Sequence, residues 1–140
     1  MDEAYYPFSQ ETALPWLGEY DNLMVIRTFS KAAGLAGLRI GFEAGNPDVI
    51  INLNKFHTVN YFNSMSVLCL GEILKNPEII DEYVSQVIED HCLLADCLED
   101  MELTAYPTNS DFVFIRVGDR FKPADLVESL KRRGYLIKGP

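Results

Sequence analysis

TFSKAAGLAGLRIG, at residues 28–41, is the most informative run in this 140-residue sequence. It directly follows an apolar segment that predicts a buried strand. A strand end is where a sheet covered by helices usually places its chemistry, so we expect the primary amine of Lys31 to be displayed there. Gly34 and Gly37 permit tight turns and the close approach of a ligand. Arg39 offers a planar fork suited to phosphate. An amine, two hydroxyls and a guanidinium together indicate a site for a phosphorylated aldehyde.

This run resembles a known cofactor motif. It is similar to the lysine motif of the aminotransferases of pyridoxal-phosphate fold type I and, within them, of the histidinol-phosphate aminotransferase family. That family's typical wording is TFSKAxGLAGLR, which the sequence matches at every fixed position of residues 28–39. The opening Asp2-Glu3-Ala4-Tyr5 matches a second family motif at the expected distance upstream. Two linked motifs make the resemblance specific, whereas a Ser-Lys pair alone would not.

The resemblance implies a binding site for pyridoxal 5'-phosphate. Lys31 would be the catalytic residue, which links to the cofactor and moves a proton at the substrate's α-carbon. Asp2 would keep the pyridine nitrogen protonated, and the Tyr5 hydroxyl would bind the phenolic oxygen. Because Lys31 must be partly deprotonated, we expect nearby Arg39 to lower its pKa. The phosphate would be held by a guanidinium and two hydroxyls, those of Arg39, Thr28 and Ser30.

The resemblance also implies an α/β fold that corresponds to the C-terminal part of such an enzyme. Residues 1–58 would belong to the large cofactor-binding domain, and residues 59–140 to the small C-terminal domain, incomplete at its end. The parent enzyme would transfer an amino group between histidinol phosphate and 2-oxoglutarate, in histidine biosynthesis, as a homodimer. The family's ring-stacking aromatic, phenolate-binding asparagine and glycine-rich phosphate turn lie outside this chain, so we expect it to be inactive alone. Lys138 stands where the family often has a substrate arginine, and it lacks bidentate geometry.

Two alternatives stay open from the sequence. Another fold type I enzyme, such as a threonine-phosphate decarboxylase or an aromatic aminotransferase, shares the lysine motif and differs in substrate-binding residues mostly outside this chain. A non-catalytic remnant of such an enzyme would keep the ancestry without the chemistry.

The composition limits the classes of partner that the chain is expected to bind. A net charge of -9 argues against nucleic acid or an anionic membrane surface as a partner. The resemblance implies small amino and oxo substrates instead. No apolar run is long enough for a membrane span, and the start carries no secretion signal pattern, so we expect a cytoplasmic protein. Cys69, Cys92 and Cys97 are odd in number and lack metal-ligand spacing. We therefore expect reduced core thiols and no metal site.

Periodicity and turn residues predict the order of elements along the chain. After a loop with one short helix opening at Pro15, strands are expected at residues 23–28, 38–44, 111–117 and 135–138. Helices are expected from Pro47, from a cap at Asn63 or Ser64, after Pro77, and from Pro123. Because the parent's large sheet would be cut, the first two strands should expose apolar edges, and we expect self-association or an altered strand arrangement.

Overall fold

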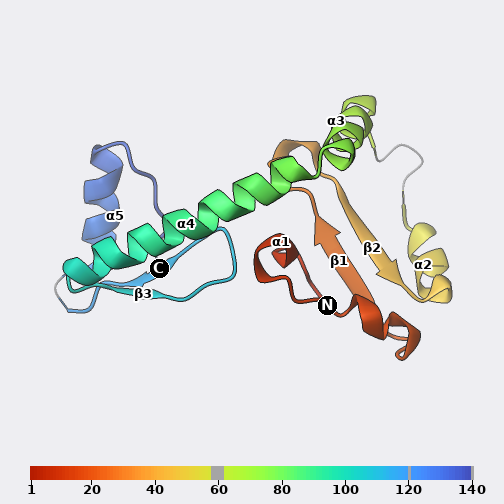
Figure 1. Cartoon of the computed structure of the whole chain (residues 1–140), viewed down its shortest axis with the longest axis horizontal. Helices are drawn as coiled ribbons and strands as arrows, with labels where there is room; N and C mark the ends of the chain where they lie inside the picture. The colour runs from red at the N-terminus through yellow and green to blue at the C-terminus, as the bar shows by residue number, and fades with distance from the viewer. Residues whose placement is uncertain (58–61, 120, 140) are drawn as a thin grey trace. The chain divides into compact units, whose positions relative to one another are not determined.

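The computed structural model describes residues 1–57, 62–119 and 121–139 (Figure 1). The chain forms two compact units. The N-terminal unit comprises Met1–Glu89 with Asn109–Asp111, and the C-terminal unit comprises Asp90–Thr108 with Phe112–Pro140. The domain boundary expected at residues 58 and 59 lies outside the described residues and stays a prediction.

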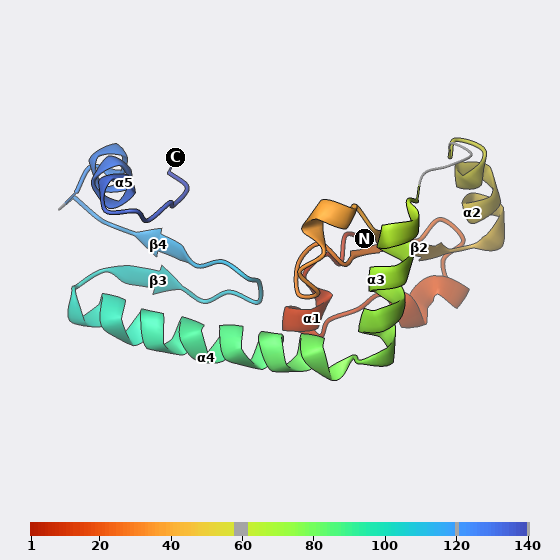
Figure 2. The same cartoon turned by 90° about the horizontal axis from the view of Figure 1, so that it is seen from above.

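A two-stranded antiparallel ladder forms the centre of the N-terminal unit (Figures 1 and 2). β1 (Met24–Thr28) pairs with β2 (Gly41–Gly45), with Thr28 opposite Gly41. The strand predicted at residues 23–28 is therefore confirmed. The one predicted at 38–44 begins later than expected, because Ala36–Leu38 forms a 3-10 turn (η2) and Arg39 adopts the left-handed conformation, with φ of 53°. Backbone in that conformation cannot join a ladder.

The helices of this unit begin where the sequence places their caps. α2 (Pro47–Asn54) follows a cap in which the Asn46 side chain accepts from the amide of Asp48. α3 (Ser64–Lys75) is capped by Asn63, whose side chain accepts from the Ser66 amide at 2.8 Å. The buried Ser66 hydroxyl in turn donates to the Leu38 carbonyl at 3.1 Å, which fastens α3 to the motif loop. The remaining helical elements are α1 (Tyr6–Ser9), η1 (Leu14–Gly18) and α4 (Glu78–Asp100), of which α1 was not anticipated.

One buried cluster of the N-terminal unit includes Ala32, the residue that follows the motif lysine. Phe8, Ala32 and Val84 form a buried cluster. Against it pack three partly buried side chains from the opening segment and the first half of α4, Tyr5, Ile80 and Val87. Since Ala32 follows Lys31 in the chain, burial of its methyl group fixes the backbone from which the lysine projects.

The C-terminal unit contains a short hairpin followed by a helix. β3 (Thr104–Tyr106) pairs antiparallel with β4 (Phe114–Arg116) (Figure 2). The ring centroids of Tyr106 and Phe114 are 5.6 Å apart. α5 (Pro123–Arg132) begins at Pro123 as predicted. The strand predicted at residues 135–138 is wrong. That segment pairs with no strand among the described residues, and its side chains, including Lys138, are exposed. Aromatic and aliphatic residues alone cannot make a strand without a neighbour to satisfy its backbone groups.

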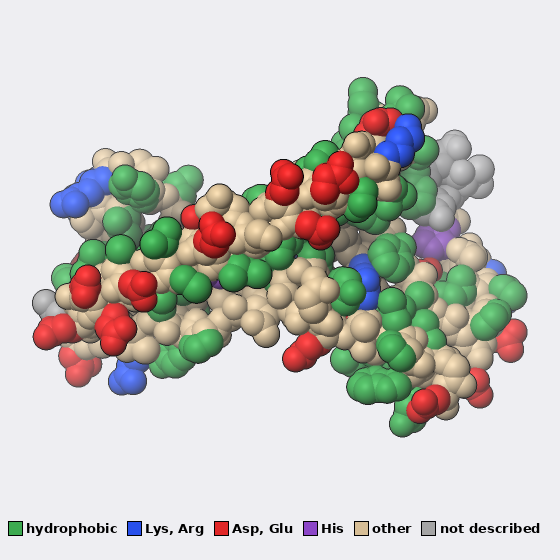
Figure 3. Space-filling model, viewed as in Figure 1, with side chains coloured by type: hydrophobic (Ala, Val, Ile, Leu, Met, Phe, Trp, Pro, Cys, Tyr) green, Lys and Arg blue, Asp and Glu red, His purple; other side chains and the backbone are tan. Residues whose placement is uncertain are grey.

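Much apolar surface is exposed, as Figure 3 shows on the visible face. Within the ladder, Ile26 is 44% and Phe42 43% exposed, in agreement with the expected uncovered sheet.

The expectation of core thiols is wrong for Cys92 and Cys97, which are exposed on α4, while Cys69 is half-buried. Helical spacing predicted an apolar face for α4, but in this chain much of that face is uncovered. No helix within the described ranges is both long and apolar enough to cross a bilayer.

Candidate active site

The motif folds into a closed loop between the two strands. The Thr28 hydroxyl donates to the Ile40 carbonyl at 3.3 Å, and the Phe29 amide donates to the same oxygen at 3.1 Å. Lys31 opens a turn in which its carbonyl accepts from the Gly34 amide at 2.8 Å. Compact loops with joined ends frequently carry functional groups. The ladder thus brings the two ends of the motif together although eleven residues of chain separate Thr28 from Ile40.

Two glycines shape this loop, and only one of them was expected to. Gly34 has φ of +69°, which confirms the predicted need for glycine there. Gly37 has open space around it and needs no special conformation. Gly41 instead carries the second constraint, because a Cβ there would lie 2.5 Å from the carbonyl oxygen of Arg27. Close pairing of β1 and β2, which the sequence does not reveal, creates this requirement.

Lys31 and Tyr5 are brought together. The Lys31 amine lies 5.0 Å from the centroid of the Tyr5 ring and hydrogen bonds to the Tyr5 hydroxyl. This hydrogen bond is the main reason that the pKa of Lys31 lies above its ordinary value of 10.5, and the Asp111 carboxylate adds a smaller effect in the same direction. The expectation that Arg39 lowers this pKa is wrong, since the tyrosine oxygen and the aspartate stabilise the ammonium form.

Asp2 lies beside the strand that leads to the lysine. Residues 1–3 run parallel to β1, with the Glu3 amide donating to the Ile26 carbonyl at 2.9 Å and the Ile26 amide donating to the Met1 carbonyl at 3.0 Å. The Asp2 carboxylate accepts from the Ala4 amide at 3.0 Å and is otherwise exposed. This placement leaves one carboxylate oxygen able to accept a further donor.

The three residues predicted to hold phosphate occupy the two ends of the loop. The Thr28 hydroxyl accepts from the Ser30 amide at 3.0 Å, so these two residues share one tight turn. Arg39 is exposed, and its Nη1 donates to the Ala36 carbonyl at 3.2 Å rather than toward Lys31. Its left-handed backbone is uncommon for a residue with a side chain and is a feature of strained functional positions.

A family comparison agrees with both motifs. The model of the aminotransferase class I and II family matches residues 1–138. The chain belongs to this aminotransferase family. Among curated relatives, histidinol-phosphate aminotransferase 1 of Ralstonia nicotianae is 34% identical over 139 residues, which are 99% of this chain and 36% of the relative. The histidinol-phosphate aminotransferase of Syntrophus aciditrophicus is 36% identical over 147 residues, again 99% of this chain and 39% of the relative.

Solved structures of an aminotransferase and of a decarboxylase share the fold. The histidinol-phosphate aminotransferase of Sinorhizobium meliloti in complex with pyridoxal-5'-phosphate superposes with a TM-score of 0.85 at 26% identity. The match covers 98% of this chain and 39% of that one. L-threonine-O-3-phosphate decarboxylase of Porphyromonas gingivalis gives a TM-score of 0.82 at 23% identity, over 98% of this chain and 43% of that one. This confirms the expected α/β fold of type I enzymes, and the chain spans about two-fifths of these relatives.

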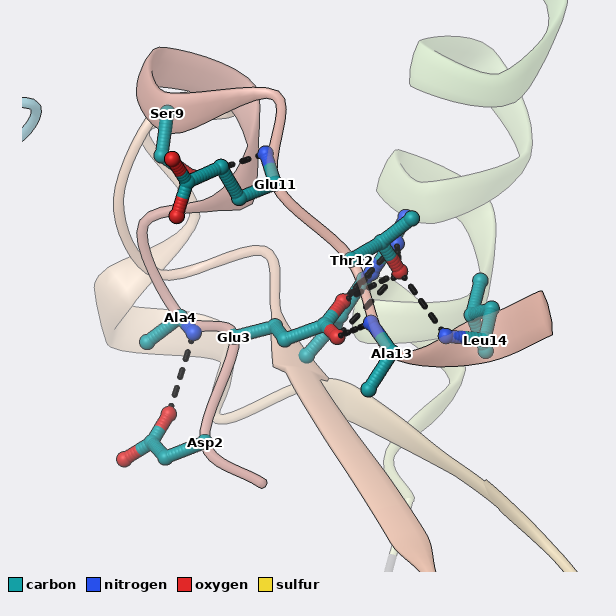
Figure 4. A network of polar contacts seen from close by, with 9 residues as sticks. Asp2, Glu3, Ala4, Ser9, Glu11, Thr12, Ala13 and Leu14 are labelled. Atoms are coloured by element: carbon teal, nitrogen blue, oxygen red, sulfur yellow. Dashed lines mark hydrogen bonds and ion pairs between the residues drawn. The ribbon is translucent and has the colours of Figure 1, made fainter. Parts of the chain in front are cut away.

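The aminotransferase chain also contains a buried ionic network that the sequence did not reveal (Figure 4). Glu3 accepts from the Ala13 amide at 2.6 Å and from the Thr12 hydroxyl at 2.9 Å. Arg27 donates to Glu3 from Nε at 3.0 Å, and its Nη2 lies 2.9 Å from the same carboxylate. Burial acts to raise the pKa of Glu3, but these donors outweigh it, so the pKa lies below its ordinary value of 4.5. Alternation along β1 could have indicated Arg27 as an inward-facing charge, but its partner was not evident.

An apolar hollow of about 340 Å³ lies next to the motif loop, lined by Leu35, Leu68, Cys69, Glu72 and Ile73. Neither Lys31 nor Arg39 lines it. In residues 1–57, 62–119 and 121–139, no group of three or more His, Cys, Asp or Glu side chains could hold a metal ion.

Proposed function

We propose that this chain supplies the lysine side of the cofactor site of a pyridoxal-phosphate-dependent aminotransferase. The observation that carries the proposal is the contact between the Lys31 amine and the Tyr5 hydroxyl, which joins the two sequence motifs at one point. An aldehyde condensing with this amine would place its neighbouring phenolic oxygen within reach of a hydroxyl donor. The donor set therefore fits an aromatic aldehyde with an ortho hydroxyl, as in pyridoxal phosphate.

Each proposed residue has a defined task. Lys31 links to the cofactor aldehyde, and its amine, once released, moves a proton at the substrate's α-carbon. Tyr5 donates to the phenolic oxygen, and Asp2 holds a proton on the pyridine nitrogen. When bound, the cofactor supplies the electron sink for the negative charge that develops at that carbon. The phosphate would be held by Thr28, Ser30 and Arg39, each charge-assisted contact contributing about 1.5–3 kcal/mol.

The side chain of Arg39 has to rotate before it can contact the phosphate. Its guanidinium is exposed and bound only weakly to a neutral carbonyl, so exchanging that hydrogen bond for a phosphate contact costs little. The backbone of Arg39 already stands next to the turn of Thr28 and Ser30, because Ile40 is bonded to both Thr28 and Phe29. A short side-chain rotation is thus the expected response to phosphate.

The substrate pair that we propose for the full-length enzyme is histidinol phosphate and 2-oxoglutarate. The names of the two curated relatives, at 34% and 36% identity, support histidinol phosphate as the phosphorylated substrate. We also propose that the full-length enzyme is a cytoplasmic homodimer. A side-by-side assay of the full-length enzyme with histidinol phosphate and with threonine phosphate tests the substrate, and preference for threonine phosphate would contradict our assignment.

The cofactor role is tested on this chain directly. Pyridoxal phosphate is added, the visible imine absorbance is recorded, and borohydride reduction fixes the adduct for peptide mapping. Replacing Lys31 by Arg should abolish the absorbance, whereas replacing the exposed Lys55 by Arg should leave it unchanged. Equal absorbance in both variants would overturn the proposal. Turnover is expected to require the rest of the enzyme, so the assay measures formation of the adduct instead of turnover.

A further inference from the structure

The Asp2–Tyr5 motif contains a charged residue to which the proposed cofactor chemistry gives no task. Glu3 lies between Asp2 and Tyr5 and is only 8% exposed, while Asp2 beside it is exposed. Burying a carboxylate is costly unless it is paired and hydrogen-bonded. A protein that needed only to cover its core could place an apolar residue there. The charge therefore calls for an explanation beyond burial.

The partner of Glu3 is held from several sides. Arg27 directs Nε and Nη2 at the Glu3 carboxylate, and Nη2 also donates to the Thr12 hydroxyl at 2.8 Å. The face of the guanidinium covers the Tyr6 ring, with its central carbon 3.4 Å from the ring centroid. Carboxylate on the edge and aromatic ring on the face leave the guanidinium a single orientation. A lysine in place of Arg27 would keep the charge, but it could reproduce neither the two-pronged contact with the Glu3 carboxylate nor the stacking on the Tyr6 ring.

This pair lies on the opposite face of β1 from two proposed cofactor ligands. Side chains alternate along a strand, so Arg27 points away from the face of Ile26 and Thr28. Asp2 is the bridge partner of Ile26, which puts its side chain on the Ile26 face and that of Glu3 on the Arg27 face. Figure 4 agrees, since the carboxylates of Asp2 and Glu3 point in different directions. The Glu3–Arg27 pair thus holds the opening segment to β1 on the face opposite Asp2 and Thr28.

We propose that Glu3 and Arg27 are positioning residues that fix the register of the opening segment on β1 and so hold the Tyr5 hydroxyl against the Lys31 amine. The proposal rests on the proposed function for the roles of Tyr5 and Lys31. The chain path is short on both sides: Tyr5 follows Glu3 by two residues, and Lys31 follows Arg27 by four. Displacement at the pair is therefore passed directly to the contact between tyrosine and lysine.

The test measures the pKa of the Lys31 amine in the absence of any cofactor. The rate of acetylation of Lys31 by acetic anhydride, followed by peptide mass spectrometry from about pH 8 to pH 11, reports its pKa, and Lys55 in the same sample is the reference. In Glu3→Gln, we expect the Lys31 profile to move to lower pH, with about a tenfold faster rate at a fixed pH below the pKa for each unit of change. Tyr5→Phe should produce the same movement, and the double variant should move no further than either.

Matched variants separate positioning from stability. Glu72→Gln removes an exposed ion pair to Lys75 with a length of 2.7 Å and should leave the Lys31 profile unchanged. Arg27→Lys keeps the charge and gives a second folded test if Glu3→Gln fails to fold, as judged by circular dichroism. A wild-type Lys31 profile in a folded Glu3→Gln or Arg27→Lys variant would overturn the proposal. Failure of the proposed function would appear separately, as absence of borohydride-trapped cofactor on wild-type Lys31.

Discussion

Replacement of Gly41 by Ala tests whether close pairing of β1 and β2 sets up the lysine loop. The new methyl carbon would lie 2.5 Å from the Arg27 carbonyl oxygen, where ordinary contacts begin at 3.4 Å. The obstructing atom is backbone and cannot rotate away, so the strands must separate. Overpacking of this kind costs about 1–3 kcal/mol, and a melting temperature falls by roughly 4–8 °C per kcal/mol in a unit of this size.

Two other glycines of the same loop are the matched controls. Gly37→Ala meets open space and should be neutral, or stabilising by about 0.4–1 kcal/mol through the unfolded chain. Gly34→Ala must keep φ of +69° and should cost about 1–2 kcal/mol. Urea denaturation and borohydride trapping of the cofactor on Lys31 are measured for all three variants. If Gly41→Ala is as stable as Gly37→Ala, the described pairing of the two strands is wrong.

Three further predictions follow from the described contacts. Because the pKa of Glu3 is lowered in the folded chain, its stabilisation is present above the ordinary value of 4.5 and is lost as the pH falls through the folded value; urea midpoints should therefore fall at acid pH, and Glu3→Gln should flatten that dependence. Thiol reagents should modify the exposed Cys92 and Cys97 before the half-buried Cys69, and the reverse order would contradict the described surface of α4. Asn63→Ala should cost about 1 kcal/mol through loss of the α3 cap, whereas an unchanged urea midpoint would show that the cap is not formed.

Local signals in the sequence predicted the elements that depend on local chemistry. Asn63 and Pro123 were placed correctly because capping and proline geometry act within one turn of a helix. The strand at β1 was predicted because an apolar β-branched run leaves few alternatives. By contrast, residues 135–138 have strand composition but pair with no strand in the part of the chain that the structure describes, and pairing is not encoded in the segment itself.

The site shows the same division between local and long-range information. Two motifs 23 residues apart, counted from Tyr5 to Thr28, were recognised by their wording, and the structure then supplied the contact between Tyr5 and Lys31. The direction in which the pKa of Lys31 shifts was predicted incorrectly. Arg39 is close to Lys31 in sequence, yet Tyr5 and Asp111, both distant in sequence, determine the electrostatic environment of the amine. The Glu3–Arg27 pair was missed for the same reason, since its members lie 24 positions apart in the sequence.

Site-resolved mass spectrometry after borohydride reduction of the chain with pyridoxal phosphate tests the central claim most directly. Lys31 is half-buried, while the other five lysines are exposed, so random modification would favour Lys55, Lys75, Lys122, Lys131 and Lys138. Our account predicts that the reduced adduct is concentrated on Lys31 and that Tyr5→Phe lowers its share. An adduct spread over the exposed lysines, with little on Lys31, would contradict it.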